Sequence, residues 1–237
     1  MLSVSISAII TLDFIEKEGI TVKTLLQKYK HAWVFLYGLI YMPWFAYLEQ
    51  HITKNFHVIY APLDDKIPFI EIFIIPYYLW FPFMGVAVLY LFFKDKDEFY
   101  QVMKFLIIGM TIFLVFSTVF PNGQMLRPKV FERDNIFVDL VKGLYKADTP
   151  TNIFPSIHVY NTLGVYIAVR ASKHLQGKRW IQIGNFLMSA SIILSTVFLK
   201  QHSIIDMIGA FVIAAPAYYV SYVRSPYKVH ALQKAHT

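Results

Sequence analysis

The segment Ser195-Thr-Val-Phe-Leu-Lys-Gln-His-Ser-Ile-Ile-Asp206 places ionisable side chains in a part of the chain that is otherwise apolar. Between residues 186 and 223, Lys200, His202 and Asp206 are the only Lys, Arg, His, Asp or Glu residues. A charged group at membrane depth costs on the order of 3 kcal/mol unless it is paired or faces water, so such residues mark functional sites by default. The segment therefore predicts a site.

His202 and Asp206 are four residues apart, so on a helix the carboxylate would lie one turn from the imidazole and accept its inner N–H. The outer ring nitrogen would then be free to act as a nucleophile or base, and histidine suits both roles near neutral pH. A second histidine, His158, ends the segment Phe154-Pro-Ser-Ile-His158. One histidine near a helix end is usually solvated or buried in a core, but two histidines with a carboxylate favour chemistry.

The composition indicates an integral membrane protein. Hydrophobic residues make up 57% of the chain and aromatic residues 17%, with a mean hydropathy of +0.49, above the values of ordinary soluble domains. Only helices or closed barrels satisfy their backbone in lipid, and the apolar runs are too continuous for barrel strands. We expect an all-α bundle of six transmembrane helices near 31–49, 71–93, 99–120, 153–171, 181–200 and 203–223.

Without repeats or long linkers, the chain is expected to form one catalytic domain over 31–224. Residues 1–30 are interpreted as a cytoplasmic lead-in and 225–237 as a cytoplasmic tail. The absence of cysteine excludes disulfides and thiolate metal sites. The adjacent Asp64 and Asp65 indicate a solvated turn rather than a metal site, because two carboxylates without further oxygen ligands rarely hold a cation. We expect no metal and no cofactor.

The formal charge of +7 does not indicate nucleic-acid binding, because the basic residues follow the loops. With the N-terminus inside, fourteen of the 22 Lys and Arg residues fall on the inner side and eight on the outer side. This bias predicts a cytoplasmic N-terminus in the plasma membrane, with both histidine segments on the exterior or luminal face.

Arg127, followed by Pro128, lies in the loop after the third predicted span, on the same outer face as the histidines. The proline disfavours a helical backbone at Arg127. A planar guanidinium offers paired donors to phosphate oxygens, although an isolated interfacial arginine more often meets lipid headgroups. Because Arg127 lies on the same face as the histidine segments, phosphate binding is the favoured role of this arginine.

The order Arg127-Pro128, then Pro155-Ser-x-His158, then Ser195 with His202 and Asp206, resembles the three-part signature of the type-2 phosphatidic acid phosphatase superfamily. The resemblance covers roughly residues 120–210 and implies a six-helix membrane enzyme that transfers lipid phosphate. It implies that His202 attacks phosphorus, Asp206 orients it and His158 protonates the leaving oxygen. It further implies that Ser156 and Arg127 hold the phosphate, with alignment and charge neutralisation doing the catalysis.

The chain departs from this signature at Phe120, where the family has a lysine, and at Thr196, where it has an arginine. Lys200, one helical turn from Thr196, is predicted to restore one charge and bind phosphate, and Gln124 or Asn122 could supply neutral donors. The Lys-Gln-His run and residues 64–77 are similar to the branch related to inositol phosphorylceramide and sphingomyelin synthases.

Three functions follow from these residues. A lipid phosphatase would let water open a phosphohistidine, a phosphotransferase would admit an alcohol, and an inactive transport or scaffold protein would keep the fold alone. Retention of His158, His202 and Asp206 disfavours the last. The expected partners are a phosphorylated lipid substrate and membrane lipids, with no nucleic acid. The sequence specifies neither the lipid, nor the acceptor, nor the oligomeric state.

Overall fold

The computed structural model describes residues 22–226. The chain divides into two compact units, Met1–Leu36 and Tyr37–Thr237. The described part of the first unit contains helix α2 (Val22–Lys28) and most of the 3-10 helix η1 (Lys30–Tyr37). The domain boundary predicted after residue 30 stays a prediction. Residues 1–21 of the predicted lead-in and 227–237 of the predicted tail lie outside the described residues.

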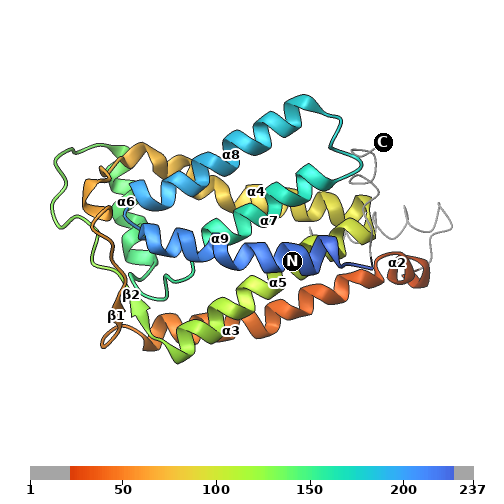
Figure 1. Cartoon of the computed structure of the whole chain (residues 1–237), viewed down its shortest axis with the longest axis horizontal. Coiled ribbons are helices and arrows are strands. Elements are labelled where there is room, and N and C mark those ends of the chain that lie inside the picture. Colours follow the sequence, from red (N-terminus) through yellow and green to blue (C-terminus); the bar gives the residue numbers. More distant parts are fainter. Residues whose placement is uncertain (1–21, 227–237) are drawn as a thin grey trace, which may run out of the picture. The chain divides into compact units, whose positions relative to one another are not determined.

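The second unit is a helical bundle (Figure 1). Its long helices are α3 (Gly38–His51), α4 (Ile74–Lys94), α5 (Lys96–Val119), α7 (Ile157–Ala171), α8 (Arg179–Phe198) and α9 (Ile204–Tyr218). Shorter elements are α6 (Ile136–Ala147), the 3-10 turns η2 (Asp64–Lys66) and η3 (Glu71–Phe73), and the π-turn η4 (Tyr219–Val223). Strands β1 (His57–Val58) and β2 (Asn122–Gly123) form a short parallel pair.

Four helical segments in the described part are long and apolar enough to cross a membrane: Glu71–Lys94, Lys96–Val119, Arg179–Phe198 and Ile204–Val223. They match four of the six predicted spans and confirm a helical chain suited to a membrane. The other two predicted spans correspond to α3 and α7, with 14 and 15 residues. At 1.5 Å per residue these helices are about 21–23 Å long, shorter than the hydrocarbon core of about 30 Å.

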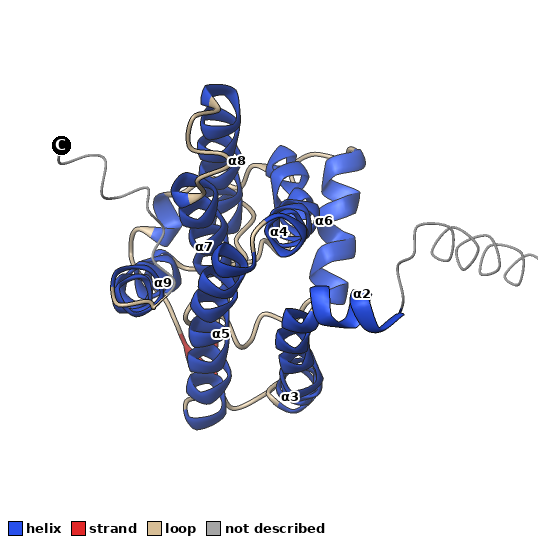
Figure 2. Ribbon diagram, turned by 90° about the vertical axis from the view of Figure 1, so that its right-hand side faces the viewer, coloured by secondary structure: helices blue, strands red, loops and turns tan. Residues whose placement is uncertain are grey.

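Helix α7 occupies the centre of the bundle, because it packs against α4, α5, α8 and α9 (Figure 2). Its contact with α5 is close: the Tyr160 ring stacks on Phe105 at a centroid distance of 4.6 Å and lies over Gly109, where a side chain would have no room. This enclosure accommodates the buried polar residues Asn161 and Thr162 of α7.

Side-chain caps define where the helices begin. Asp95, Asn135 and Ser156 accept hydrogen bonds from backbone N–H groups in the first turns of α5, α6 and α7. Ser203 and Asp206 form a capping box at the start of α9. The caps of α7 and α9 belong to the two histidine segments, so helix initiation positions both of them.

Candidate functional site

The His202 imidazole lies beside the Asp206 carboxylate, with 3.4 Å between Nδ1 and Oδ2. His202 is 8% exposed and Asp206 is fully buried. The contact is the one that the spacing predicts, but it does not arise within a helix. Because α9 begins after its cap Ser203, Asp206 reaches back from the first turn, and its Oδ2 also accepts the Ser203 N–H at 2.8 Å. The capping box therefore orients the histidine.

His158 lies in the first turn of α7, and its ring centroid is 5.9 Å from that of His202. Tyr77 and Trp80 of α4 contact the same ring at centroid distances of 4.6 and 4.4 Å. The Nε2 atom of His158 is buried and has no hydrogen-bond partner among the described residues. The structure therefore brings the two predicted catalytic histidines together, and the Nε2 atom of one of them, His158, has no hydrogen-bond partner within the described residues.

Both histidines line a cavity of about 50 Å³. The walls come from α3, α5, the loop between α6 and α7, the start of α7 and the turn before α9. Besides the histidines, the polar residues in the lining are Glu49, Asp148, Thr149, Thr151, Asn152 and Gln201. This cavity is the candidate active site.

Arg127 lies at the edge of this site, but its terminal donors are engaged by the protein. Its Nη1 donates to the carbonyls of Tyr145 (3.2 Å) and Asp148 (2.9 Å), and its Nη2 to the Thr149 carbonyl (3.1 Å) and Gln201 Oε1 (2.5 Å). The guanidinium thus caps the carboxyl end of α6, where a cation also meets the favourable end of the helix dipole. It contributes charge to the site and holds the loop that follows α6.

Ser156 joins the two histidine segments without lining the cavity. Its Oγ accepts the Val159 N–H at the start of α7, and its own N–H donates to the Asp206 carbonyl at 3.2 Å. The side chain is fully buried. Ser156 Oγ therefore acts as the acceptor that caps α7, and the predicted role of this hydroxyl in binding phosphate stays a prediction.

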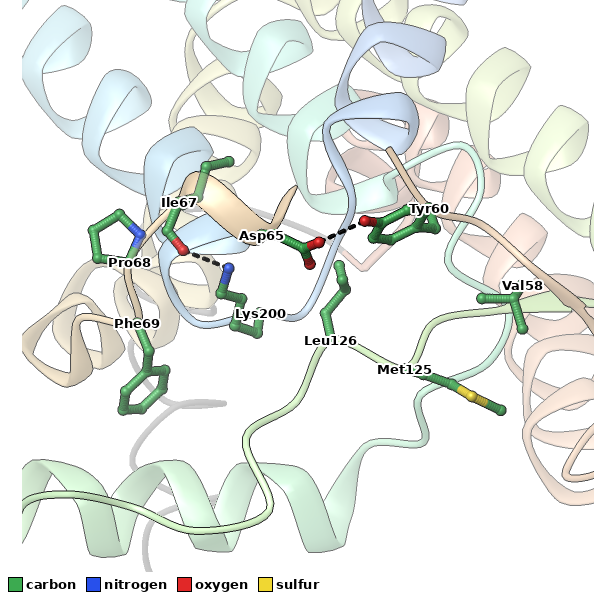
Figure 3. A pocket seen from close by; sticks show the side chains of 9 residues that line it. All are labelled: Val58, Tyr60, Asp65, Ile67, Pro68, Phe69, Met125, Leu126 and Lys200. Carbon is green, nitrogen blue, oxygen red and sulfur yellow. Dashed lines mark hydrogen bonds between the residues drawn. The ribbon is translucent and has the colours of Figure 1, made fainter. Parts of the chain in front are cut away.

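Lys200 faces away from the histidines. Its ammonium donates to the carbonyls of Asp64 (2.6 Å) and Ile67 (2.5 Å) and lies in a separate cavity of about 580 Å³ beside Tyr60 and Asp65 (Figure 3). Helix α8 ends at Phe198, and Lys200 adopts a left-handed backbone with φ of 52°. The chain therefore turns before reaching His202, and the helical geometry behind the predicted compensation for Thr196 does not apply.

We expect Lys200→Ala to lower stability more than turnover. The Asp64 and Ile67 carbonyls would lose a charged donor, which costs about 1.5–3 kcal/mol, while the histidine cavity would keep all its lining residues. Thermal unfolding in detergent, with Lys129→Ala as the exposed control, measures the first effect. A loss of turnover of about a hundredfold in correctly folded protein, the scale of a lost transition-state donor, would contradict this assignment.

The two neutral donors predicted to replace the missing lysine support the backbone instead. Asn122 Oδ1 accepts the N–H groups of Ile153 and Phe154 at 3.0 and 2.9 Å. Gln124 donates from Nε2 to the Lys200 carbonyl and accepts the Leu126 N–H at Oε1. These residues hold the loop before α7 and the turn before α9 in place.

Asp64 is buried, which corrects the prediction of a solvated turn. It is 2% exposed, and its Oδ2 accepts the Ser203 hydroxyl at 2.6 Å and the Ala61 N–H at 2.8 Å. Its Oδ1 accepts the Ile204 N–H at 2.9 Å. Asp64 therefore reinforces the amino-terminal cap of α9 from a segment far away in the sequence.

Glu49 and Asp148 are site residues that the sequence reasoning missed. Glu49 accepts the Thr149 hydroxyl at 2.6 Å and the Asn152 amide at 2.9 Å, so it ties the loop after α6 to α3. The Asp148 Oδ2 lies 3.4 Å from the Gln201 amide. A signal for Glu49 existed, because it is the only acidic residue in the apolar run 31–49.

Burial and neighbouring charges shift two titratable groups in the loops around the cavity. Burial and the Glu49 charge raise the pKa of Asp148 to about 6, although Arg127 acts in the opposite direction. Burial, together with the Arg127 charge, lowers the pKa of His202. A hydrogen bond with the Ile153 backbone acts in the opposite direction and raises it. His202 is therefore neutral at pH 7, the form that can act as a nucleophile.

Asp148→Asn should change how stability depends on pH between about 4 and 6. Because the folded state raises the Asp148 pKa, the native chain loses stability as pH rises from the ordinary value of 3.8 through about 6. The charged groups that face this carboxylate are Glu49 and Arg127. The Tm of the wild type minus that of the asparagine variant, measured in detergent, should fall across this range. A Tm difference that does not change with pH would refute the raised pKa of Asp148.

One group with metal-ligand spacing occurs among residues 22–226, outside the cavity of His158 and His202. Asp95, Glu98 and His174 each offer a ligand atom, and these atoms lie within 4.8 Å of one another. Here Lys173 donates its ammonium to Asp95 Oδ2 at 2.5 Å and its N–H to Glu98 Oε1 at 2.9 Å. The lysine already supplies a positive charge to this group.

Comparison with known proteins identifies no relative: no family model, no curated protein and no solved structure matches this chain.

Proposed function

We propose that this chain is an integral-membrane lipid phosphatase that acts through a phosphohistidine, as the resemblance to type-2 phosphatidic acid phosphatases implies. One observation carries the proposal: the buried His202–Asp206 pair faces a second histidine, whose Nε2 is unpartnered, across one small cavity. A nucleophile, its orienting carboxylate and a proton donor are the minimum set for this chemistry.

In the proposed reaction the Nε2 lone pair of His202 attacks phosphorus, while Asp206 accepts the Nδ1–H and stabilises the charge that develops on the ring. With the phosphate bound, His158 carries a proton on its Nε2, stabilised by the phosphate charge, and gives it to the leaving lipid oxygen. Water then attacks the phosphohistidine and returns a proton to His158. Arg127, although its donors bind carbonyls, places a positive charge near the phosphoryl oxygens.

The proposed architecture is the six-span bundle. Four spans are the long apolar helices, and the remaining two are α3 and the enclosed α7. Residues 31–224 would form the catalytic domain in the plasma membrane. The basic-residue bias supports a cytoplasmic N-terminus and a site on the exterior or luminal face.

A phosphotransferase is the second candidate, and the acidic lining of the cavity favours it. Glu49 and Asp148 beside the histidines suit a substrate that carries a cationic headgroup, as some phosphodiester lipids do and phosphatidate does not. An alcohol would then take the place of water. An inactive transport or scaffold protein stays the third candidate.

The proposal is tested with purified protein in detergent and a panel of phosphorylated lipids, with and without alcohol acceptors. We expect release of the lipid alcohol in chelator as well as in magnesium. The enzyme should also carry a phosphoryl group that is labile to acid and stable to alkali, as a P–N bond is. If no lipid yields either the lipid alcohol or the phosphorylated enzyme, the enzyme assignment is refuted. A requirement for magnesium would refute the proposed mechanism.

A further inference from the structure

A further cavity lies between α4, α7 and α8 and shares no lining residue with the histidine cavity. Its volume is about 610 Å³, and its lining is apolar apart from Tyr90, Lys178 and Asn185. The lining includes buried side chains such as Leu91 and exposed ones such as Val86, which is 69% exposed. The cavity is therefore an apolar groove that opens on the surface of the bundle, and we call it the α4–α8 groove.

The α4–α8 groove lies at the end of the bundle opposite the histidine cavity. His158 is in the first turn of α7, whereas Val169 of the groove is in its last turn. Likewise, α8 ends at Phe198, shortly before His202, whereas Lys178 of the groove precedes its first residue. Figure 1 shows α6 and the connection between α7 and α8 at opposite ends of the bundle.

The groove has the depth of one bilayer leaflet. Its lining runs from Leu79 to Leu91 along α4 and from Lys178 to Met188 along α8. At 1.5 Å per residue these stretches are about 15–18 Å long, about half of a hydrocarbon core of about 30 Å. Both helices are long and apolar enough to cross a membrane. The groove therefore accommodates an acyl chain from the leaflet at this end of the bundle.

Positive charge gathers where the groove ends, at the start of α8. Lys178 and Arg179 are exposed, and neither forms an ion pair among residues 22–226. The first turn of α8 has no acidic residue and no side-chain cap, so its N–H groups and the helix dipole also favour an anion. Trp180 is 82% exposed, as is typical of tryptophan at the headgroup level of a membrane. Lys178 and Arg179 therefore form a cationic rim at headgroup depth.

The neighbouring acidic residues do not cancel this charge. An ion pair between Lys173 and Asp95, at 2.5 Å, joins residues 170–179 to residues 94–98. The two segments together contain six Lys or Arg residues and three Asp or Glu residues. Basic pockets between membrane helices bind anionic lipid headgroups. The cationic rim is therefore suited to a lipid phosphate.

We propose that the α4–α8 groove binds an anionic phospholipid, with one acyl chain between α4 and α8 and the phosphate at the cationic rim. In the proposed orientation this lipid belongs to the cytoplasmic leaflet, which is the leaflet rich in anionic lipids. A zwitterionic phospholipid would bring a further cation close to Lys178, so it should bind less tightly. The inference concerns binding within a membrane and does not rest on the proposed phosphatase activity.

Gly184 allows a variant that fills the groove without a clash inside the bundle. It lines the groove, and a Cβ atom built on it has no neighbour within 4 Å. Gly184→Leu should therefore place a side chain in the space of the acyl chain. Gly85→Leu is the matched control, because Gly85 lies in α4, also has nothing within 4 Å of its built Cβ and is outside the lining. Both substitutions make the same change in helix propensity.

The test uses the full chain in detergent with a phosphatidylglycerol that carries a photoreactive diazirine on one acyl chain. Labelled peptides are mapped by mass spectrometry, with unmodified phosphatidylglycerol or phosphatidylcholine of identical acyl chains as the competitor. We expect labels within residues 79–91 and 178–188. Phosphatidylglycerol should compete at about 10- to 30-fold lower concentration than phosphatidylcholine, because each of the two rim cations contributes about fivefold.

The variants separate the rim from the groove. Lys178→Gln combined with Arg179→Gln should make the two competitors nearly equal. Lys129→Gln combined with Lys146→Gln removes two exposed cations outside the groove and should leave the difference unchanged. Gly184→Leu should remove most of the labelling, and Gly85→Leu should retain it.

Equal competition by the two lipids in the wild type would overturn the inference, because unspecific contact with lipid gives that result. Unchanged labelling in folded Gly184→Leu would overturn it too. So would the absence of label from residues 79–91 and 178–188, the result expected if another segment of the chain or a second copy occupies the groove. Since the wild-type competition needs no variant, misfolding of a variant leaves the inference testable. The readout is binding, so a protein without phosphatase activity can still confirm it.

Discussion

His202→Ala should abolish release of the lipid alcohol, with a loss of at least about 10⁴-fold in kcat. The expectation follows from position: among residues 22–226, His202 is the imidazole that combines a carboxylate on Nδ1 with a cavity shared by a second histidine. His158 shares the cavity, but the structure shows no carboxylate bonded to its ring, so we expect it not to replace the attacking nitrogen. The rate that remains in His202→Ala would measure the catalysis provided by substrate binding and by the remaining charges alone.

The measurement is single-turnover release of diacylglycerol from phosphorylated lipids, together with a search for the acid-labile phosphoenzyme. His202→Ala should form no phosphoenzyme, while His158→Ala should form it slowly because proton transfer alone is impaired. His51→Ala, an exposed histidine outside the cavity lining, is the matched control. Activity near the wild-type level in folded His202→Ala would refute the nucleophile assignment.

Gly109→Ala should have the largest effect on stability among small substitutions in the bundle. A Cβ atom at Gly109 would lie well inside van der Waals contact with the Tyr160 ring. That ring cannot move easily, because it is fully buried, stacks on Phe105 and donates its hydroxyl to the Phe105 carbonyl at 2.8 Å. We expect a loss of about 3 kcal/mol or more, well above the gain of about 1 kcal/mol in helix propensity.

Gly143→Ala is the matched control, because Gly143 is also helical and has nothing within 4 Å of its built Cβ. It should be neutral or should raise stability by about 0.5–1 kcal/mol. Thermal unfolding of both variants in the same detergent separates steric overlap from propensity. Equal Tm values for the two variants would show that α5 and α7 pack less closely than described.

The agreement between sequence and structure is best where the contact is local. The four long helices that could span a membrane follow from their apolar runs, and Asp206 approaches His202, four residues away, although His202 precedes the helix. The Ser203–Asp206 capping box is equally local. In each case the interacting groups are joined by a few peptide units, whose geometry has few alternatives.

The polar groups around the cavity show the opposite behaviour. Glu49 meets Thr149 and Asn152 about a hundred residues away, and Asp64 caps α9 across a similar gap in the chain. Arg127 matches a phosphate-binding motif in the sequence, yet in the structure its donors bind the end of α6. Each of these partners depends on which loops the bundle brings to one end.

The sequence by itself determined a helical chain with four helices apolar enough to span a membrane, and it singled out His158, His202 and Asp206 as neighbours, because hydropathy and short-range spacing are properties of the covalent chain. Only the tertiary structure decided which charges share the cavity. It placed Lys200 on the carbonyls of Asp64 and Ile67 and placed Glu49 and Asp148 beside the histidines. The physical reason is that buried charges take the partners that packing brings within hydrogen-bond distance, and the order of residues along the chain does not specify that distance.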